Sequence, residues 1–288
     1  MNQNYILACS ITAVMLLFGC SSFNTEEAVP SYINIKNYSL STNGNQGSIH
    51  HNFQDAWMYV NGDYAGAYQI PFNIPVLSTG NSTIRVTPGI RVNGSQTEAR
   101  IYPFIKAYET NQLLAPGLST LINPIYEYES DVFFPLNEDF DFTHFFTKDI
   151  DGDLETKMVL SASADSYEGA NSGVIRVDSI HQNYIGGYEK SISIPVTPNR
   201  VYIELHFKST VNFYVGLYGI IPGSTPVDLV VARLNPKTEW TKVYFDFTEL
   251  TNSSGATSYQ PVIQLHYDKE RPEIDQVVKI DNLKIIYR

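Results

Sequence analysis

Tyrosine and histidine side chains alternate with apolar residues in two successive stretches within residues 201–218, and their types suit stacking against sugar rings. The alternation is the pattern of half-buried strands. If the two strands pair as a hairpin, Tyr202 lies opposite Tyr218 and His206 lies opposite Tyr214. The four rings then form a platform on one sheet face, and such platforms, with polar neighbours, bind pyranose rings.

Two alternatives stand beside this platform. Consecutive strands of a two-sheet sandwich often lie in opposite sheets, and the four side chains would then not meet. A second candidate site consists of the loop aromatics Tyr184, Tyr188 and Tyr259 at the rim of the sandwich. Tyrosines on strands also serve ordinary cross-strand packing, because they fit a pleated surface well.

Acidic side chains alternate along residues 149–155, with Asp149, Asp151, Asp153 and Glu155 around Gly152. Carboxylate oxygens at this density suit Ca²⁺, which takes six to eight oxygen ligands. The run is not an EF-hand loop, because the glycine comes one position early and no helical pattern flanks it. The alternative is a solvated acidic turn.

The sequence contains no recognisable catalytic motif. It has no G-x-S-x-G, no H-E-x-x-H and no phosphate-binding P-loop pattern. Its two cysteines, Cys9 and Cys20, both lie near the start of the chain. We therefore expect a non-catalytic protein, with an unrecognised hydrolase that uses paired carboxylates as the alternative.

The elements that position these residues are predicted to be strands throughout. The chain has 20 Tyr and 15 Phe, and its strand-like stretches are short and separated by turn residues. No sustained helical period appears between Pro198 and Arg288. We predict an all-β protein, with a small sandwich-like β module over residues 31–125 and a β jelly roll over residues 126–288.

The first module contains a clear hairpin. Ala56 to Val60 reads as a strand, Asn61-Gly62 is the favoured pair for a type I′ turn, and residues 64–70 return. The sequence from Asp55 to Ile90, "AWMYVNGDYAGAY…IP…G…TIRVTPG", resembles the small PEGA-type β modules of bacterial surface proteins. That resemblance implies an accessory or spacer role rather than chemistry.

The second half resembles the galactose-binding-like jelly rolls that include carbohydrate-binding modules. The similar segments are "LNEDFDF" at 136–142, "GANSGVIRV" at 169–177, "NRVYIELHFKS" at 199–209, "TEWTKVYFDF" at 238–247 and "VVKIDNLKIIY" at 277–287. The resemblance implies carbohydrate binding and a structural Ca²⁺ between the first and last strands. The matching positions for that ion are Glu138 or Asp139, together with Asp281.

The beginning of the chain predicts export. Residues 6–18 are almost wholly apolar, too few to span a bilayer comfortably, and they are followed by Gly19 and Cys20. The run Leu17-Phe18-Gly19-Cys20 resembles the lipobox of bacterial lipoproteins, although the first four residues include no Lys or Arg. The resemblance implies a signal peptide over 1–19, fatty acylation of Cys20 and a tether over 20–30.

Charge and location limit the partners. The net charge of −11, from 19 basic and 30 acidic residues, argues against nucleic acid. We expect a lipoprotein that is held in the outer membrane by the lipid on Cys20. We expect its jelly roll to bind a polysaccharide. The alternative is an adhesin or interaction subunit whose partner is a protein of the cell envelope.

Overall fold

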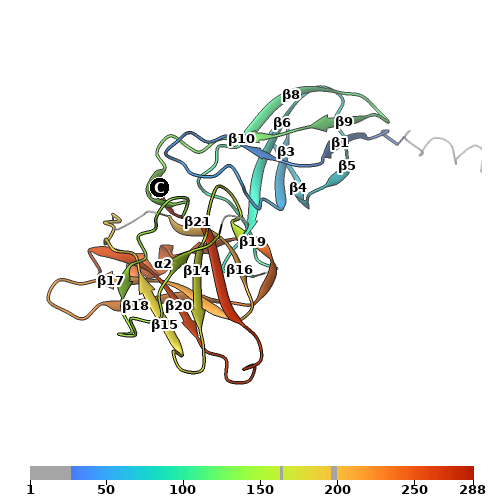
Figure 1. Ribbon diagram of the computed structural model, residues 1–288. Helices are drawn as coiled ribbons and strands as arrows, with labels where there is room; N and C mark the ends of the chain where they lie inside the picture. Colours follow the sequence, from blue (N-terminus) through green and yellow to red (C-terminus); the bar gives the residue numbers. More distant parts are fainter. Residues whose placement is uncertain (1–26, 96, 163–164, 196–199) are drawn as a thin grey trace, which may run out of the picture.

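The computed structural model describes residues 27–95, 97–162, 165–195 and 200–288, which form two successive β modules (Figure 1). The predicted signal segment and Cys20 lie outside the described residues. The all-β prediction is confirmed, because strands dominate both modules and the one helix among the described residues is the short α2, Thr248–Ser253. No helix in the described ranges is long and apolar enough to cross a bilayer.

The first module packs two small sheets against each other. One has the order β4-β3-β6-β7 with β8 beside β6, the other has the order β5-β1-β9, and β10 pairs with β2. The predicted hairpin is present, since β3 and β4 are joined by Asn61 (φ 53°) and Gly62 (φ 90°). Both have the positive φ that a type I′ turn requires. The strands are β1 Ser31–Ile35, β2 Ser39–Leu40, β3 Asp55–Val60, β4 Asp63–Gln69, β5 Phe72–Val76, β6 Gly80–Arg91, β7 Ala99–Ile101, β8 Tyr108–Leu114, β9 Ser119–Ile122 and β10 Ile125–Tyr126.

The second module is the predicted jelly roll. One sheet has the order β13-β14-β21-β16-β19 with β11 beside β21, and we call it the covered sheet. The other has the order β12-β15-β20-β17-β18, and we call it the open sheet. The strands are β11 Phe133–Glu138, β12 Lys148–Asp149, β13 Val159–Leu160, β14 Gly173–Val177, β15 Asn183–Gly187, β16 Val201–Ser209, β17 Phe213–Ile220, β18 Val227–Leu234, β19 Lys237–Asp246, β20 Ser258–His266 and β21 Gln276–Tyr287.

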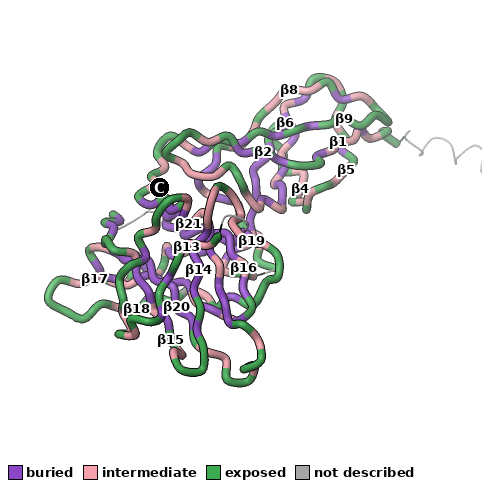
Figure 2. Tube along the Cα trace, in the orientation of Figure 1, coloured by how far each residue is buried: buried purple, intermediate pink, exposed green. Residues whose placement is uncertain are grey.

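Alternation along the strands builds the core between these two sheets. Ile203, Leu205 and Phe207 of β16 point inward from the covered sheet, and Val215 and Leu217 of β17 meet them from the open sheet. All five are at most 1% exposed, so the middle of the jelly roll is dry, as the buried segments of Figure 2 indicate. Burial of this apolar surface is the main force that holds the two sheets together.

The first module sits on the outer face of the covered sheet. Tyr202, Tyr244 and Ile286 of that face belong to the same buried cluster as Tyr102 and Phe104 of the first module. A parallel bridge joins Val92 to Tyr244, and the Asn93 amide donates to the Tyr244 carbonyl at 2.8 Å. The apolar core of the first module therefore continues into the jelly roll.

The first module extends a few residues beyond the predicted domain boundary. The predicted boundary between residues 125 and 126 falls inside strand β10, which pairs with β2. Tyr126 and Tyr128 both belong to the first module's core, and β11 of the jelly roll begins at Phe133.

Candidate functional site

The hairpin on which the predicted aromatic platform depends does not form. Strand β16 pairs with β19 and β21 in the covered sheet, whereas β17 pairs with β18 and β20 in the open sheet. The sequence alternation is right for each strand, but consecutive strands of this jelly roll lie in opposite sheets. Tyr202 and His206 therefore face one way, and Tyr214 and Tyr218 face the other.

Tyr202 and His206 are enclosed between the two modules. Each is 2% exposed, and the Tyr202 hydroxyl donates to Asp246 at 3.1 Å. The His206 ring stacks on Tyr167 with centroids 3.9 Å apart. Burial, with nearby positive charge from Lys242, lowers the pKa of His206 to about 2, so the ring is neutral. These two side chains offer no surface to a ligand.

The rim aromatics form no exposed platform either. Tyr184 is 3% exposed and Tyr259 is 1% exposed within the sandwich core, where the Tyr259 hydroxyl donates to the Thr251 carbonyl. Tyr188 is half-buried and packs edge-on against Phe146. Of the five tyrosines and one histidine proposed as ligand contacts in 184–218, Tyr188, Tyr214 and Tyr218 remain partly accessible, and Tyr214 and Tyr218 share one strand.

The Tyr184 hydroxyl has a distinct environment. It has no hydrogen-bond partner within the described protein, and neither has Nδ1 of His144. Both residues line a pocket of about 230 Å³ beside β12 and β15. Two unpaired polar atoms around a small cavity are the setting in which proteins hold ordered water.

Tyr214 and Tyr218 lie on the outer face of the open sheet. They are four positions apart on β17, which corresponds to roughly 13 Å along a strand. Gly216 lies between them, so no side chain separates the two rings along the strand. Both rings are half-exposed.

Polar side chains from the neighbouring strands flank each tyrosine. By register, Tyr214 lies between Gln264 of β20 and Arg233 of β18. Tyr218 lies between Gln260 of β20 and Asp228 of β18. Each ring thus has hydrogen-bonding groups on both sides.

Hydrogen bonds fix several of these polar groups in place. Gln264 Nε2 donates to Asp228 Oδ2 at 3.2 Å, and Lys148 Nζ donates to Gln260 Oε1 at 2.9 Å. Side chains held in this way lose less conformational entropy when a ligand binds. The face continues toward a pocket of about 360 Å³ that Tyr214, Arg233 and His266 help to line.

Sequence reasoning missed the flanking residues, although a signal for them exists. In β20, Gln260, Gln264 and His266 lie on one face together with Val262, while Ile263 and Leu265 point into the core. Side chains two positions apart share a face of a strand, so three polar residues at this spacing indicate the outer face. Asp228 and Arg233 of β18 have no comparable signal, because the register shifts within the β17–β18 pair.

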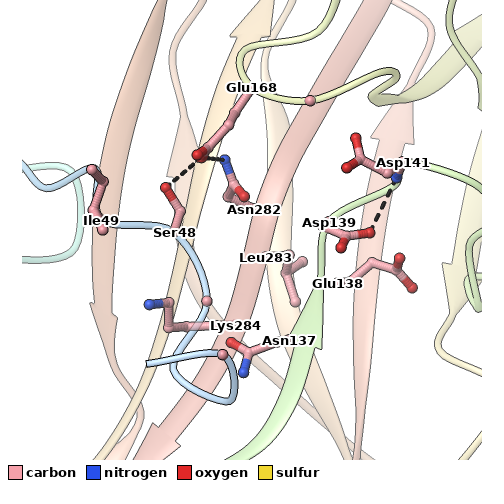
Figure 3. Close-up of a pocket in the computed structure, with 13 residues that line it drawn as sticks. Ser48, Ile49, Asn137, Glu138, Asp139, Asp141, Glu168, Asn282, Leu283 and Lys284 are labelled. Atoms are coloured by element: carbon pink, nitrogen blue, oxygen red, sulfur yellow. Dashed lines mark hydrogen bonds between the residues drawn. The ribbon is translucent and has the colours of Figure 1, made fainter. Parts of the chain in front are cut away.

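A second cavity, of about 600 Å³, lies between the modules (Figure 3). Ser48 and Asn282 both donate to the Glu168 carboxylate across it. Lys284 Nζ donates to the Gln46 carbonyl at 2.7 Å and to the Tyr128 hydroxyl at 3.2 Å. These polar groups tie the 44–49 loop of the first module to the last strand of the jelly roll.

The carboxylates predicted to bind Ca²⁺ accept hydrogen bonds from backbone amides. Glu138 accepts from Phe140 and Phe145, and Asp281 accepts from Tyr167, Glu168 and Asn282. Asp139 accepts from the Asp141 amide. Burial raises the pKa of Glu138, and it raises the pKa of Asp281 to about 6. These groups shape the loops beside the cavity.

The acidic run at 149–155 bonds to its own backbone in the same manner. Asp149 accepts from Gly152, Asp151 accepts from Asp153, and Asp153 accepts from Glu155. In the part of the chain that the structure describes, no three or more His, Cys, Asp or Glu side chains are grouped to hold a metal ion. The Ca²⁺ site stays a prediction.

No protein-family model and no curated protein matches the chain. Among solved structures, the xylan-binding domain from carbohydrate-binding module family 22 is similar, with 12% identity and a TM-score of 0.38, over 53% of this chain and 93% of that domain. A family 30 carbohydrate-binding module is also similar, with 12% identity and a TM-score of 0.38, over 55% of this chain and 88% of that module.

The enzymatically active domain of tailspike protein 4 from bacteriophage CBA120 matches with 11% identity and a TM-score of 0.35. That match covers 45% of this chain and 17% of the tailspike chain. At these identities and TM-scores the similarity concerns the fold alone, and no statement about a ligand or an activity rests on it.

Proposed function

We propose that this protein is a non-catalytic, lipid-anchored lipoprotein of the outer membrane that binds carbohydrate on the outer face of the open sheet. The observation that carries the proposal is the pair Tyr214 and Tyr218, half-exposed on one face and flanked by fixed polar side chains. The corresponding face of the covered sheet is closed by the first module.

The chemistry of this face matches what sugar recognition requires. Pyranose rings offer apolar C–H faces for stacking and hydroxyls for hydrogen bonding. The two tyrosines supply the first kind of contact. Asp228 and Arg233, which are exposed beside the rings, supply an acceptor and donors for the second. Gln260 and Gln264 are 2% and 8% exposed and are already bonded to Lys148 and Asp228. A site open along β17 and across the sheet suits an extended chain of sugars rather than a single small molecule.

The non-catalytic part of the proposal is supported by the placement of the carboxylates with raised pKa. The pKa is raised at Asp55, Glu138, Asp151 and Asp281. Asp55 accepts a hydrogen bond from Arg91, and the other three accept hydrogen bonds from backbone amides. The anchor is proposed from the residues that precede and include Cys20.

The experiment is glycan binding by the mature, lipidated protein in detergent micelles, on a glycan array and by retardation in gels that contain soluble polysaccharides. We expect saturable retention by one class of polysaccharide. A Tyr214→Ala/Tyr218→Ala double variant should lose at least tenfold in affinity, because both stacking surfaces are removed. The matched control is Tyr64→Ala, which removes an exposed tyrosine of the first module, 57% accessible, and should leave retention unchanged.

Retention that survives the double variant would place the ligand elsewhere and overturn the assignment of this face. No retention by any glycan would overturn carbohydrate binding and favour a protein partner in the cell envelope. Repeating the gel with EDTA tests the predicted Ca²⁺, since loss of retention would show that a metal ion supports the binding fold.

A further inference from the structure

Four apolar side chains are exposed together at the end of the first module that lies farthest from the jelly roll. Val29 is 59% exposed, Leu77 80%, Leu113 70% and Leu118 63%. We call this set the distal end. It occupies the right-hand extremity of the molecule in Figure 1, where the N-terminal segment enters the fold.

Backbone contacts place the four residues at one end of the sandwich. The Gly117 amide donates to the Pro30 carbonyl and the Tyr32 amide donates to the Leu118 carbonyl, each at 2.8 Å. Ser31 pairs with Val76, the residue before Leu77. On the other sheet, Leu113 pairs with Asn81, directly after the turn that follows Leu77. The entering chain and two turns therefore meet here.

The distal end is set in a region almost free of charge. Residues 64–84 contain no Asp, Glu, Lys or Arg, and neither do residues 110–126, in a chain with 49 such residues. The charged pair nearest along β6 and β8 is Arg85 with Glu109, five positions from the Gly80–Leu114 pair. Five positions are roughly 17 Å of strand. Glu26 and Glu27, which precede Val29 in the sequence, are the exceptions.

The anchor limits what can cover this surface. Cys20 and Val29 are nine positions apart, which fully extended is about 30 Å. A lipid on Cys20 therefore keeps the distal end within about 30 Å of the bilayer. Exposed leucines with no charge around them match the boundary between headgroups and acyl chains, where apolar side chains gain by burial.

We propose that the distal end rests on the surface of the membrane in which the Cys20 lipid is embedded. This inference rests on the proposed lipid anchor. The contact adds a second attachment to the lipid and turns the jelly roll away from the bilayer, toward the compartment where a polymer is met. The membrane is favoured over a protein occupant because the tether holds the bilayer close and because the surface has no charge to select a particular protein.

The test uses the mature, lipidated protein in phosphatidylcholine vesicles. The sequence has no cysteine after Cys20, whose thiol is blocked by the lipid, so Leu113→Cys introduces one labelling site for an environment-sensitive fluorophore. The matched control is Ser224→Cys, an exposed position in the β17–β18 loop of the jelly roll. With spin-labelled lipids we expect quenching at position 113 at least threefold stronger than at position 224, unchanged when one fifth of the lipid is phosphatidylglycerol.

Adding Leu77→Asp and Leu118→Asp to the labelled variant should abolish the difference in quenching while the protein stays bound to the vesicles. Equal quenching at the two labelled positions would overturn the distal contact. A label that is shielded in a concentration-dependent way without lipid quenching would assign the surface to a second copy of the chain instead.

A Cys20→Ser variant tests the anchor separately. Release of this variant from membranes supports the anchor, whereas retention would overturn the anchor and with it the basis of this inference. If the lipid on Cys20 holds the protein on vesicles but quenching at position 113 is weak, the distal contact is overturned and the anchor is not.

Discussion

The two outer faces of the jelly roll begin from the same sequence pattern and reach opposite environments. On the covered sheet, Glu204 and His206 alternate with core residues and are 1% and 2% exposed. On the open sheet, Arg233 and His266 alternate with core residues in the same way and are exposed, whereas Gln260 and Gln264 of that face are 2% and 8% exposed. Alternation shows which side chains leave the core. It does not show whether they reach water, because the cover comes from a distant part of the chain.

The covered face has to satisfy its charges internally. Glu204 accepts from Tyr102 of the first module and forms an ion pair with Lys242 at 3.0 Å. Burial alone would raise the pKa of Glu204, but the positive charges of Lys242 and Lys284 outweigh it and the pKa is lowered. Burial lowers the pKa of Lys284 to about 8. On the open face, Gln260 and Gln264 are joined to their partners Lys148 and Asp228 by hydrogen bonds, and no buried ion pair is formed among these four residues.

The largest loss of stability should come from removing one charge from the buried group of Glu204, Lys242 and Lys284. Glu204→Gln leaves Lys242 buried without its ion-pair partner, and removal of one partner from a buried pair costs about 3–5 kcal/mol. Urea unfolding at pH 7 measures the loss. The matched change on the open face, Asp228→Asn, should cost less than about 0.5 kcal/mol. Similar losses for both variants would mean that the two faces do not differ as described.

Tyr202 and Tyr218 are expected to differ in what their removal costs: stability for Tyr202 and glycan binding for Tyr218. Tyr202→Ala removes a ring that packs on Phe104 with centroids 5.2 Å apart, and truncation of a buried aromatic costs about 3 kcal/mol. Tyr218→Ala on the open face should cost less than about 1 kcal/mol in stability but weaken glycan binding. Thermal unfolding and gel retardation of both variants test whether one loses stability while the other loses binding. Loss of binding by Tyr202→Ala at temperatures where it stays folded would contradict it.

The smallest effect concerns pH and the buried Asp281. Its folded pKa is raised to about 6 from an ordinary value of 3.8, so the folded state holds the proton more tightly than the unfolded state. Its contribution to stability is therefore greatest below pH 4 and is lost as pH rises through 6. Asp281→Asn has no such loss and should be more destabilising at pH 4 than at pH 7.

That difference is roughly 2 kcal/mol, because each unit of pKa corresponds to about 1.4 kcal/mol. The measurement is urea unfolding of the wild type and Asp281→Asn at both pH values. The reverse order at Asp281 would mean that its carboxylate is stabilised as an ion in the folded state.

The parts of the fold that could be predicted from sequence are those set by neighbouring residues. The Asn61-Gly62 turn and the alternation in β16 and β17 depend on local backbone preference and on one apolar face, and both are found. The partners of β16 and β17, which lie in opposite sheets, could not be predicted, because register and sheet membership depend on strands such as β21, about 80 residues further along.

The same distinction between local pattern and distant contacts applies to the candidate site. The alternation predicts that Tyr214 and Tyr218 leave the core, and they do; Tyr202 and His206 also leave it but are buried, because their cover includes Tyr102 and His50 of the first module. A role of Tyr214 and Tyr218 in binding stays a prediction. The polar partners Asp228 and Arg233 were missed because a register shift in the β17–β18 pair breaks simple alternation.

The bridge between Val92 and Tyr244 has a mechanical consequence. If a polymer binds the open sheet and a lipid holds Cys20, as we propose, a force on the polymer reaches the first module by two routes. One is the covalent link between Tyr128 and Phe133, and the other is the shared core with its bridge and the Asn93 hydrogen bond. Load divided between them resists bending at the junction, so drag on the polymer is transmitted to the anchor with little hinging of one module on the other.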